Sequence, residues 1–223
     1  MKIRIAEIFE SISGEVGGFP QGSPTTFVRL AGCSLGCPFC DTRQWQDPES
    51  GTERTIESVV FDIFAFPWKQ VLITGGEPME QKKVVQDLVN KIKGNSIGYK
   101  IQVETNGTIP LSDMYLVDHW VVDNKGLDAM GGVPYQFDPQ IIGGNMWIKC
   151  LVGSQADLDS AIGFAAGLQG LAERVRPKVA ISVLAGKPWS SKRTNIQETV
   201  RAILASKIPI LLNIQIHKVF GVR

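Results

Sequence analysis

The sequence has few cysteines and histidines, no large excess of charge of either sign, and no long apolar run. Its 223 residues include 23 Lys and Arg against 22 Asp and Glu, which leaves a formal net charge of +1. There is no basic arm or acidic tail, so nucleic acid is not an expected partner. Nowhere do 18 apolar residues follow one another, and the N-terminus mixes charged with apolar residues. We therefore expect neither a membrane span nor a signal peptide.

The apolar fraction of 43% is that of an ordinary globular protein, and the length suits one elaborate domain over residues 1–223. Short apolar runs alternate with helical patterns along the chain. The predicted strands are 2–8, 26–30, 70–74, 100–104, 119–123, 146–152, 178–184 and 208–216. Helices are predicted over 55–65, 80–93 and 195–206, with another starting near Ser154 and capped with the help of Asp157. Gly94 is the expected stop of the second helix, and 126–144 is expected to be a long loop.

Alternating strands and helices predict a parallel sheet with helices packed outside it. Polar residues follow three of the strands: Thr74-Gly75-Gly76-Glu77-Pro78, Glu104-Thr105-Asn106-Gly107 and Asp123-Asn124-Lys125. Because ligands of parallel α/β folds bind at the carboxyl ends of the strands, these residues are expected to share one site.

Three of the four cysteines fall within eight residues, Cys33-Ser34-Leu35-Gly36-Cys37-Pro38-Phe39-Cys40. Such a cluster in this composition favours metal binding in a reducing compartment, the cytoplasm, over a disulfide framework. Thiolates suit zinc or an iron–sulfur cluster. A structural zinc would require a fourth ligand, for which Cys150 and His217 are the remote candidates. An iron–sulfur cluster on three cysteines leaves one iron free to bind a small molecule.

The CX3CX2C spacing, followed by Gly75-Gly76-Glu77 after a strand, resembles the radical S-adenosylmethionine (SAM) superfamily. Within it, the chain resembles the 7-carboxy-7-deazaguanine synthase family over nearly its whole length. The motifs that carry this narrower resemblance are Glu7-Ile8-Phe9, Ser11-Ile12-Ser13-Gly14-Glu15, Gly22 to Cys33, Cys40-Asp41-Thr42, Thr74 to Pro78, Glu104 to Gly107, and Gln215-Ile216-His217-Lys218 with Gly221.

The resemblance implies a partial, open TIM-like βα barrel with substrate-binding segments at both ends of the chain. It implies a lyase that converts 6-carboxy-5,6,7,8-tetrahydropterin to 7-carboxy-7-deazaguanine with loss of ammonia, in the synthesis of queuosine or another 7-deazapurine. The implied cofactors are a 4Fe-4S cluster, SAM and Mg2+. An electron donor such as flavodoxin or ferredoxin is an implied partner, and a homodimer is expected because the open sheet leaves edges that association can cover.

The resemblance also implies roles for individual residues. The cluster ligands are Cys33, Cys37 and Cys40, and Mg2+ is contacted by Thr42. SAM is bound by Phe39, Cys40, Asp41, Gly76, Glu77, Asp123, Asn124, Lys125 and Ser154. The pterin is bound by Ile12, Ser13, Gly14, Arg29, Thr74, Gln215, His217 and Arg223, the last through its terminal carboxylate. Ser13 stands where Gln is common in the family, and Ser154 is placed by topology alone.

Plainer interpretations of the same residues stay open at this level. Glu77 can be a solvated acid at a helix N-terminus, Phe39 a core residue, and Arg29 one half of an internal ion pair. His217 is expected on a terminal strand, where it orients substrate or serves the structure. Two other functions are also compatible with the cysteines: an activating enzyme for a glycyl-radical enzyme, and a non-enzymatic zinc-binding interaction module.

Overall fold

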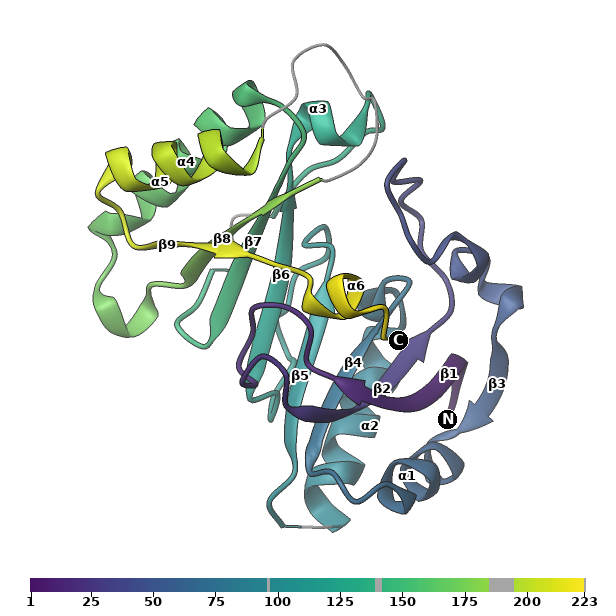
Figure 1. Cartoon of the computed structure of the whole chain (residues 1–223). Helices are drawn as coiled ribbons and strands as arrows, with labels where there is room; N and C mark the ends of the chain where they lie inside the picture. The colour runs from purple at the N-terminus through teal and green to yellow at the C-terminus, as the bar shows by residue number, and fades with distance from the viewer. Residues whose placement is uncertain (96, 139–141, 185–194, 223) are drawn as a thin grey trace.

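The computed structural model describes residues 1–95, 97–138, 142–184 and 195–222. Within these residues, nine strands form one sheet in the order β3-β1-β2-β4-β5-β6-β7-β8-β9. From β2 to β9 every neighbouring pair is parallel, whereas β1 pairs antiparallel with both β2 and β3. No pairing in the described chain joins β3 to β9, so the sheet curves without closing (Figure 1). The expected open α/β barrel is confirmed.

The strands are β1 (Lys2–Ile12), β2 (Pro24–Leu30), β3 (Thr52–Thr55), β4 (Gln70–Gly75), β5 (Lys100–Thr105), β6 (His119–Lys125), β7 (Met146–Val152), β8 (Lys178–Val183) and β9 (Ile210–Asn213). The helices are α1 (Ile56–Ala65), α2 (Lys82–Asn95), α3 (Leu127–Met130), α4 (Gln155–Gly167), α5 (Ile196–Ser206) and α6 (Ile216–Phe220). Short 3-10 turns include Pro78–Gln81, directly before α2. None of the described helices is long and apolar enough to cross a membrane.

Local sequence accounts for the helix starts. The Thr55 side chain accepts from Ser58 N at the start of α1, and Ser154 accepts from Asp157 N at the start of α4, as predicted. Asn195 and Glu198 form a capping box at α5. Each cap satisfies backbone N–H groups that the first helical turn leaves without partners.

The two faces of the sheet differ in chemistry. On the face covered by helices, alternate strand residues such as Val28, Ile73 and Ile148 are fully buried with Leu88 of α2 and Leu158 of α4. The residues between them point to the inner face, where neighbouring strands set polar groups in register: Arg29 opposite Thr74, and Asp123 opposite Lys149. The period of two along a strand therefore separates an apolar core from a polar interior.

Five details differ from the sequence predictions. Strand β3 was not predicted, and β1 continues to residue 12. Gly94 is the last but one residue of α2, which ends one residue after it, at Asn95. The last predicted strand is shorter, since β9 stops at Asn213 and His217 belongs to the short helix α6. The expected loop after β6 contains α3. The Asp128 and Ala129 backbone amides of this helix donate hydrogen bonds to the buried Asp157 carboxylate.

Candidate active site

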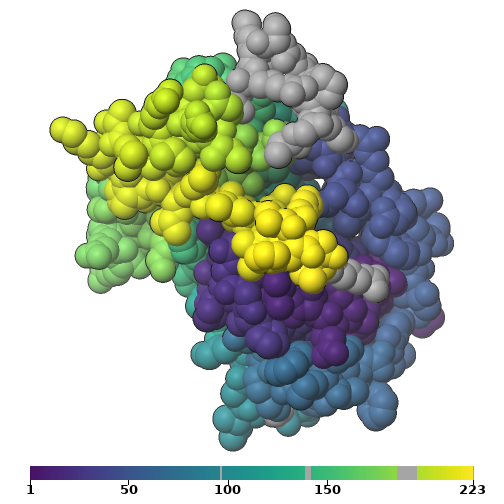
Figure 2. Space-filling view, viewed as in Figure 1, coloured from purple at the N-terminus to yellow at the C-terminus, as the bar shows by residue number. Residues whose placement is uncertain are grey.

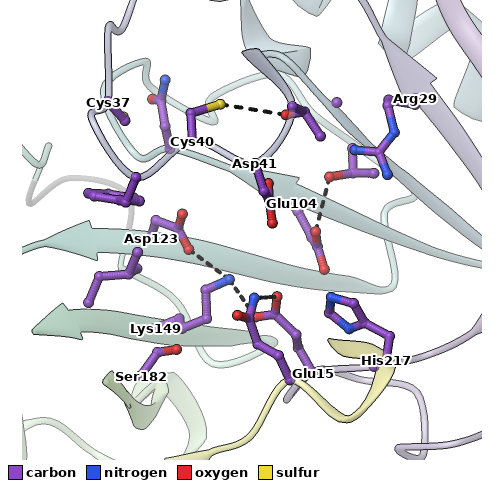
Figure 3. A pocket seen from close by; sticks show the side chains of 18 of the residues that line it. Glu15, Arg29, Cys37, Cys40, Asp41, Glu104, Asp123, Lys149, Ser182 and His217 are labelled. Atoms are coloured by element: carbon purple, nitrogen blue, oxygen red, sulfur yellow. Dashed lines mark hydrogen bonds and ion pairs between the residues drawn. The ribbon is translucent and has the colours of Figure 1, made fainter. Parts of the chain in front are cut away.

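A cavity of 680 Å³ opens on the inner face of the sheet at the carboxyl ends of the parallel strands. Its volume is in the range that holds small-molecule ligands. The predicted site residues among its lining are Ile12, Ser13, Gly14, Arg29, Cys33, Cys37, Phe39, Cys40, Asp41, Thr42, Thr74, Gly76, Asp123, Lys125, Gln215 and His217. The structure therefore brings both ends of the chain and the cysteine loop to one site (Figure 3).

Four predicted residues are placed elsewhere or are not described. Glu77 and Asn124 are not among the lining residues. Ser154 is 1% exposed and caps α4, which occupies its hydroxyl. Arg223 lies outside the described residues.

The cysteine loop is held by backbone contacts at its start. Gly32 N donates to Trp45 O at 2.9 Å, and Cys33 N donates to Gln46 O at 2.9 Å. Ser34 N donates to the Glu80 carboxylate at 2.7 Å. Because these partners follow the loop in sequence, the 33–46 segment folds back on itself and presents its thiols to the cavity.

Burial affects the protonation of two of the thiols in this loop. Burial raises the pKa of Cys33 to about 11 and also raises the pKa of Cys37. Without metal these sulfurs keep their protons at neutral pH, and iron binding displaces them. All four cysteines are free of disulfides.

The donor set fits a cluster better than a single zinc ion. Among the described residues, no three His, Cys, Asp or Glu side chains lie close enough together to hold one metal ion. Cys150 is 2% exposed in the apolar core, so it is not the fourth zinc ligand considered from the sequence. In a 4Fe-4S cluster each cysteine binds a different iron, so the three sulfurs need not surround one point.

The Gly75-Gly76 turn docks against the chain that enters the cysteine loop. Gly76 N donates to Leu30 O, and Glu77 N donates to Gly32 O, both at 2.8 Å. Gly75 has a φ of +128°, which L side chains rarely adopt. A Cβ on Gly76 would lie 1.9 Å from Gly32 O. Both glycines are thus required for the close approach of β4 to the cysteine loop.

The Glu77 carboxylate is fully buried and bonded by the protein. It accepts hydrogen bonds from Met79 N at 2.8 Å, Thr105 Oγ1 at 2.7 Å and Asn106 N at 2.6 Å. Burial raises its pKa to about 6 against these bonds. Glu77 is therefore not a solvated helix-terminal acid, because it ties the β4 turn to the end of β5. Its predicted contact with the SAM ammonium remains a prediction.

The end of β6 supplies charges to the cavity. Asp123 Oδ2 lies 2.5 Å from Lys125 Nζ, and the Lys125 ammonium stands 5.5 Å from the centre of the Phe39 ring. Lys125 and Lys149 lower the pKa of Asp123 although burial alone would raise it. Phe39 therefore lies at the cavity wall beside a cation and is not a core residue. Asn124 alternates to the other face of the strand, next to Cys150.

The N-terminal turn and the C-terminal segment form one wall. Ile216 N donates to Gly14 O at 2.9 Å, and a Cβ on Gly14 would lie 2.1 Å from His217 Nδ1. Gln215 Nε2 donates to Glu15 Oε1 at 2.6 Å. Figure 2 shows the C-terminal residues in yellow lying against the N-terminal segment in purple. The resemblance motifs at residues 11–15 and 215–218 are thus neighbours in space.

Arg29 lies between an ion pair and the cavity. Its Nε donates to Glu7 Oε1 at 2.8 Å, which is the internal ion pair considered from the sequence. The side chain nevertheless lines the cavity, where its remaining N–H groups are able to meet an anionic ligand. Burial lowers the pKa of Arg29, and Asp41, Glu104 and Cys40 oppose that effect.

Asp41 and Thr42 follow the last cysteine at the cavity mouth. Asp41 Oδ2 pairs with Lys218 Nζ of α6 at 2.6 Å. Thr42 Oγ1 lies 3.6 Å from Cys40 Sγ. These contacts connect the cysteine loop to the C-terminal helix.

Several lining residues were not predicted from the sequence as site residues. They are chiefly Glu15, Lys149 and Ser182, whereas Glu104 was expected at the site only as one of the polar residues that follow a strand. Thr74 Oγ1 donates to Glu104 Oε2 at 3.0 Å, and burial raises the pKa of Glu104 to about 7. One signal was available: Glu104 and Lys149 are charges within apolar strands, as Arg29 is.

Comparisons with known proteins agree on the family. The model of the radical SAM superfamily matches residues 27–120. A 7-carboxy-7-deazaguanine synthase of Hyperthermus butylicus is 35% identical over 173 residues, covering 74% of this chain and 72% of that protein. One of Methanospirillum hungatei is 30% identical over 221 residues, covering 98% and 86%.

The fold agrees as well. The crystal structure of QueE from Escherichia coli superposes with a TM-score of 0.69 at 21% identity and covers 95% of this chain and 93% of that one. These similarities favour neither the glycyl-radical activating enzyme nor the zinc-binding module, so both alternatives from the sequence are set aside. By its relatives, its fold and its three-cysteine site, the chain belongs to the 7-carboxy-7-deazaguanine synthase family of the radical SAM superfamily.

Proposed function

We propose that this protein is a radical SAM lyase that converts 6-carboxy-5,6,7,8-tetrahydropterin to 7-carboxy-7-deazaguanine and ammonia. The supporting observation is a cavity that joins the three-cysteine loop to a polar inner face closed by both ends of the chain. Relatives named 7-carboxy-7-deazaguanine synthase align with most of the chain. The reaction belongs to the synthesis of queuosine-type 7-deazapurines.

On this proposal, Cys33, Cys37 and Cys40 would hold a 4Fe-4S cluster, and SAM would bind beside it. When bound, the two cofactors supply radical chemistry through one-electron cleavage of a carbon–sulfur bond in SAM. The SAM-binding residues would be Phe39, Cys40, Asp41, Gly76, Asp123 and Lys125, all of which line the cavity. Glu77 would also contact SAM, and its carboxylate accepts hydrogen bonds from Thr105 Oγ1 and Asn106 N, two residues of the cavity lining.

The substrate would bind against the wall opposite the cysteine loop. Arg29 presents guanidinium N–H groups to the substrate carboxylate, for which a planar fork is well suited. Ser13, Gly14, Gln215 and His217 supply polar groups to the heterocycle. Ile12 and Thr74 complete this wall of the cavity.

Glu104 is suited to carry a proton in the ring contraction. Its carboxyl group is half-buried at the cavity wall and has a pKa of about 7. Ammonia leaves as a neutral molecule only after its nitrogen has gained protons, and an acid that titrates near neutral pH is effective in such a transfer. The Thr74 hydroxyl orients the carboxyl group by donating to Oε2.

Mg2+ would be bound at Thr42, with the substrate carboxylate as its main additional ligand. Oxygen ligands suit this ion, which also keeps several waters. Since no described cluster of acids alone is arranged to hold a metal ion, the ion would enter together with the substrate.

The partners on this proposal are the small pterin and an electron donor such as flavodoxin or ferredoxin in the cytoplasm. We also propose a homodimer. The described residues expose Ile196, Val200 and Leu204 on α5 and Leu211 on β9, the last strand of the open sheet. Exposed apolar side chains beside an unpaired strand edge favour association. Sedimentation that gives the mass of one chain at micromolar concentration would contradict it.

The function is tested by product analysis after anaerobic reconstitution of the cluster. The reaction contains SAM, reductant, Mg2+ and the pterin, and mass spectrometry is expected to detect 7-carboxy-7-deazaguanine. Cys37→Ser should lose iron and all SAM cleavage, whereas Cys150→Ser, at a cysteine outside the cavity, should retain both. If the reconstituted natural protein cleaves SAM but forms no 7-carboxy-7-deazaguanine, the substrate assignment is refuted.

A further inference from the structure

Lys149 is a buried cation between two parts of the cavity wall. It lies on β7 opposite Asp123 of β6 and is 8% exposed. Its Nζ is 2.6 Å from Glu15 Oε2 and 3.1 Å from Asp123 Oδ1 (Figure 3). A buried ammonium is tolerated when carboxylates surround it. Lys149 therefore depends on both partners, which belong to different segments of the chain.

Glu15 connects Lys149 to the wall formed by the two chain ends. Its carboxylate also accepts from Gln215 Nε2 at 2.6 Å and from Asn213 Nδ2 at 3.1 Å. Val16 N donates to Asn213 Oδ1 at 2.9 Å. Residues 13–16 and 213–217 are thus one hydrogen-bonded unit, which we call the closing unit. Within the proposed function it receives the pterin.

Asp123 connects Lys149 to the other side. Its second oxygen pairs with Lys125, which faces the Phe39 ring. In the proposed function this side of the cavity receives SAM. One ammonium therefore bridges the segment assigned to SAM and the segment assigned to the substrate.

The charges around Lys149 make the bridge sensitive to ligands. Burial alone would lower the pKa of Lys149, but Asp123, Glu15 and Glu104 raise it well above its usual value, so it stays protonated. Asp123 and Glu15 share this ammonium. A ligand group that donates to Asp123 satisfies part of its charge and leaves Lys149 to pair more fully with Glu15. Linkage makes this coupling reciprocal. A ligand that orders Glu15 therefore strengthens ligand binding beside Asp123 by the same factor.

We infer that Lys149 is a positioning residue that couples SAM binding to the ordering of the closing unit. SAM bound beside Asp123 thereby prepares the turn that receives the pterin. The inference rests on the proposed function for the identity of the two ligands.

The first test is hydrogen exchange of the reconstituted holoenzyme with and without SAM. The reporters are the amides of Ser13, Val16 and Ile216, which are bonded within or beside the closing unit. SAM should slow their exchange about tenfold in the natural protein, in the range of ordinary site coupling. The effect should vanish in Lys149→Met. Lys100→Met, which removes an exposed strand lysine paired with Asp118, should keep the effect.

Two further variants distinguish a loss of coupling from a general folding defect. Lys149→Arg keeps the cation and should recover most of the coupling, whereas Glu15→Gln with Lys149→Met keeps the charges balanced but should not recover it. In kinetics, Lys149→Met should raise KM for the pterin about tenfold with a smaller change in kcat, as expected when positioning is lost.

The failures are separable. A natural protein that binds SAM but forms no product refutes the proposed function, and the exchange experiment still decides the role of Lys149. Equal SAM protection of the closing unit in Lys149→Met and Lys100→Met would overturn the inference, whatever the product.

Discussion

Replacing Gly76 with alanine tests how the β4 turn holds the cysteine loop. The added Cβ would lie 1.9 Å from Gly32 O and 2.5 Å from Gly32 C. Both are backbone atoms, so no side-chain rotation relieves the overlap. Carbon–oxygen contacts need about 3.3 Å, so the turn must retreat by about 1.4 Å from the chain entering the cysteine loop.

The cost can be worked from the two hydrogen bonds that the retreat breaks. Gly76 N to Leu30 O and Glu77 N to Gly32 O each measure 2.8 Å. Leaving such buried groups without partners costs about 1–3 kcal/mol each, so we expect a loss of about 2–6 kcal/mol in the free energy of unfolding. For a chain of this size, at about 2–4 °C per kcal/mol, the melting temperature then falls by about 4–24 °C.

The assay is thermal unfolding of the cluster-free protein, followed by iron content and SAM affinity after reconstitution. The matched control is Gly94→Ala, because a Cβ there meets nothing within 4 Å and the position lies inside α2. That variant should be as stable as the natural protein or more stable by up to about 1 kcal/mol. If Gly76→Ala melts with the control and binds SAM unchanged, the turn does not set the position of the cysteine loop.

Three further predictions concern the substrate side. In Glu104, the pKa of about 7 exceeds the ordinary 4.5, so the folded state binds this proton more tightly and stability is lost as pH rises from 4.5 through 7. The melting temperature of cluster-free Glu104→Gln, measured relative to that of the natural protein, should therefore rise between pH 5 and pH 8. If the melting temperatures of the two proteins change with pH in parallel, the pKa assignment is wrong. Gly14→Ala should displace the His217 ring, whose Nδ1 would be 2.1 Å from the new Cβ, and raise KM for the pterin about tenfold or more; Gly163→Ala in α4, where a Cβ meets no atom within 4 Å, serves as the control, and an equal KM in the two variants would contradict the prediction. Arg29→Ala should keep SAM cleavage but lose most ring contraction, with Arg29→Lys recovering less than half of it; normal product yield from Arg29→Ala would remove Arg29 from the substrate contacts.

The parts of the fold that sequence predicts well have strong local signals. Apolar runs such as 70–74 and 146–152 become buried parallel strands, and Ser154 with Asp157 caps a helix as expected. Strand β3 has no apolar signal, since it reads Thr-Glu-Arg-Thr and forms by pairing with β1. Gly94 is tolerated inside α2 because the apolar face formed by Leu88 and Ile92 is buried.

The candidate site divides in the same way. Motif spacing predicts the cysteine loop and the residues near it, since these contacts are local. It does not predict that Glu77 is bonded within the protein, because its partner Thr105 lies 28 residues away. Glu15 and Lys149 escaped notice because their pairing spans 134 residues. A charge in an apolar strand indicates that a partner exists, but tertiary structure decides which one.

The closing unit gives the two walls of the site different folding requirements. Residues 30 to 81 form the cysteine wall through contacts close in sequence, such as Gly32 with Trp45 and Ser34 with Glu80. The opposite wall joins Glu15 to Gln215, 200 residues apart. Contacts over such separations carry a higher loop-closure cost and open more readily in local unfolding. Opening the closing unit exposes the substrate wall while these local contacts of the cysteine wall stay in place, so the cluster loses only the Asp41–Lys218 ion pair as support during substrate access.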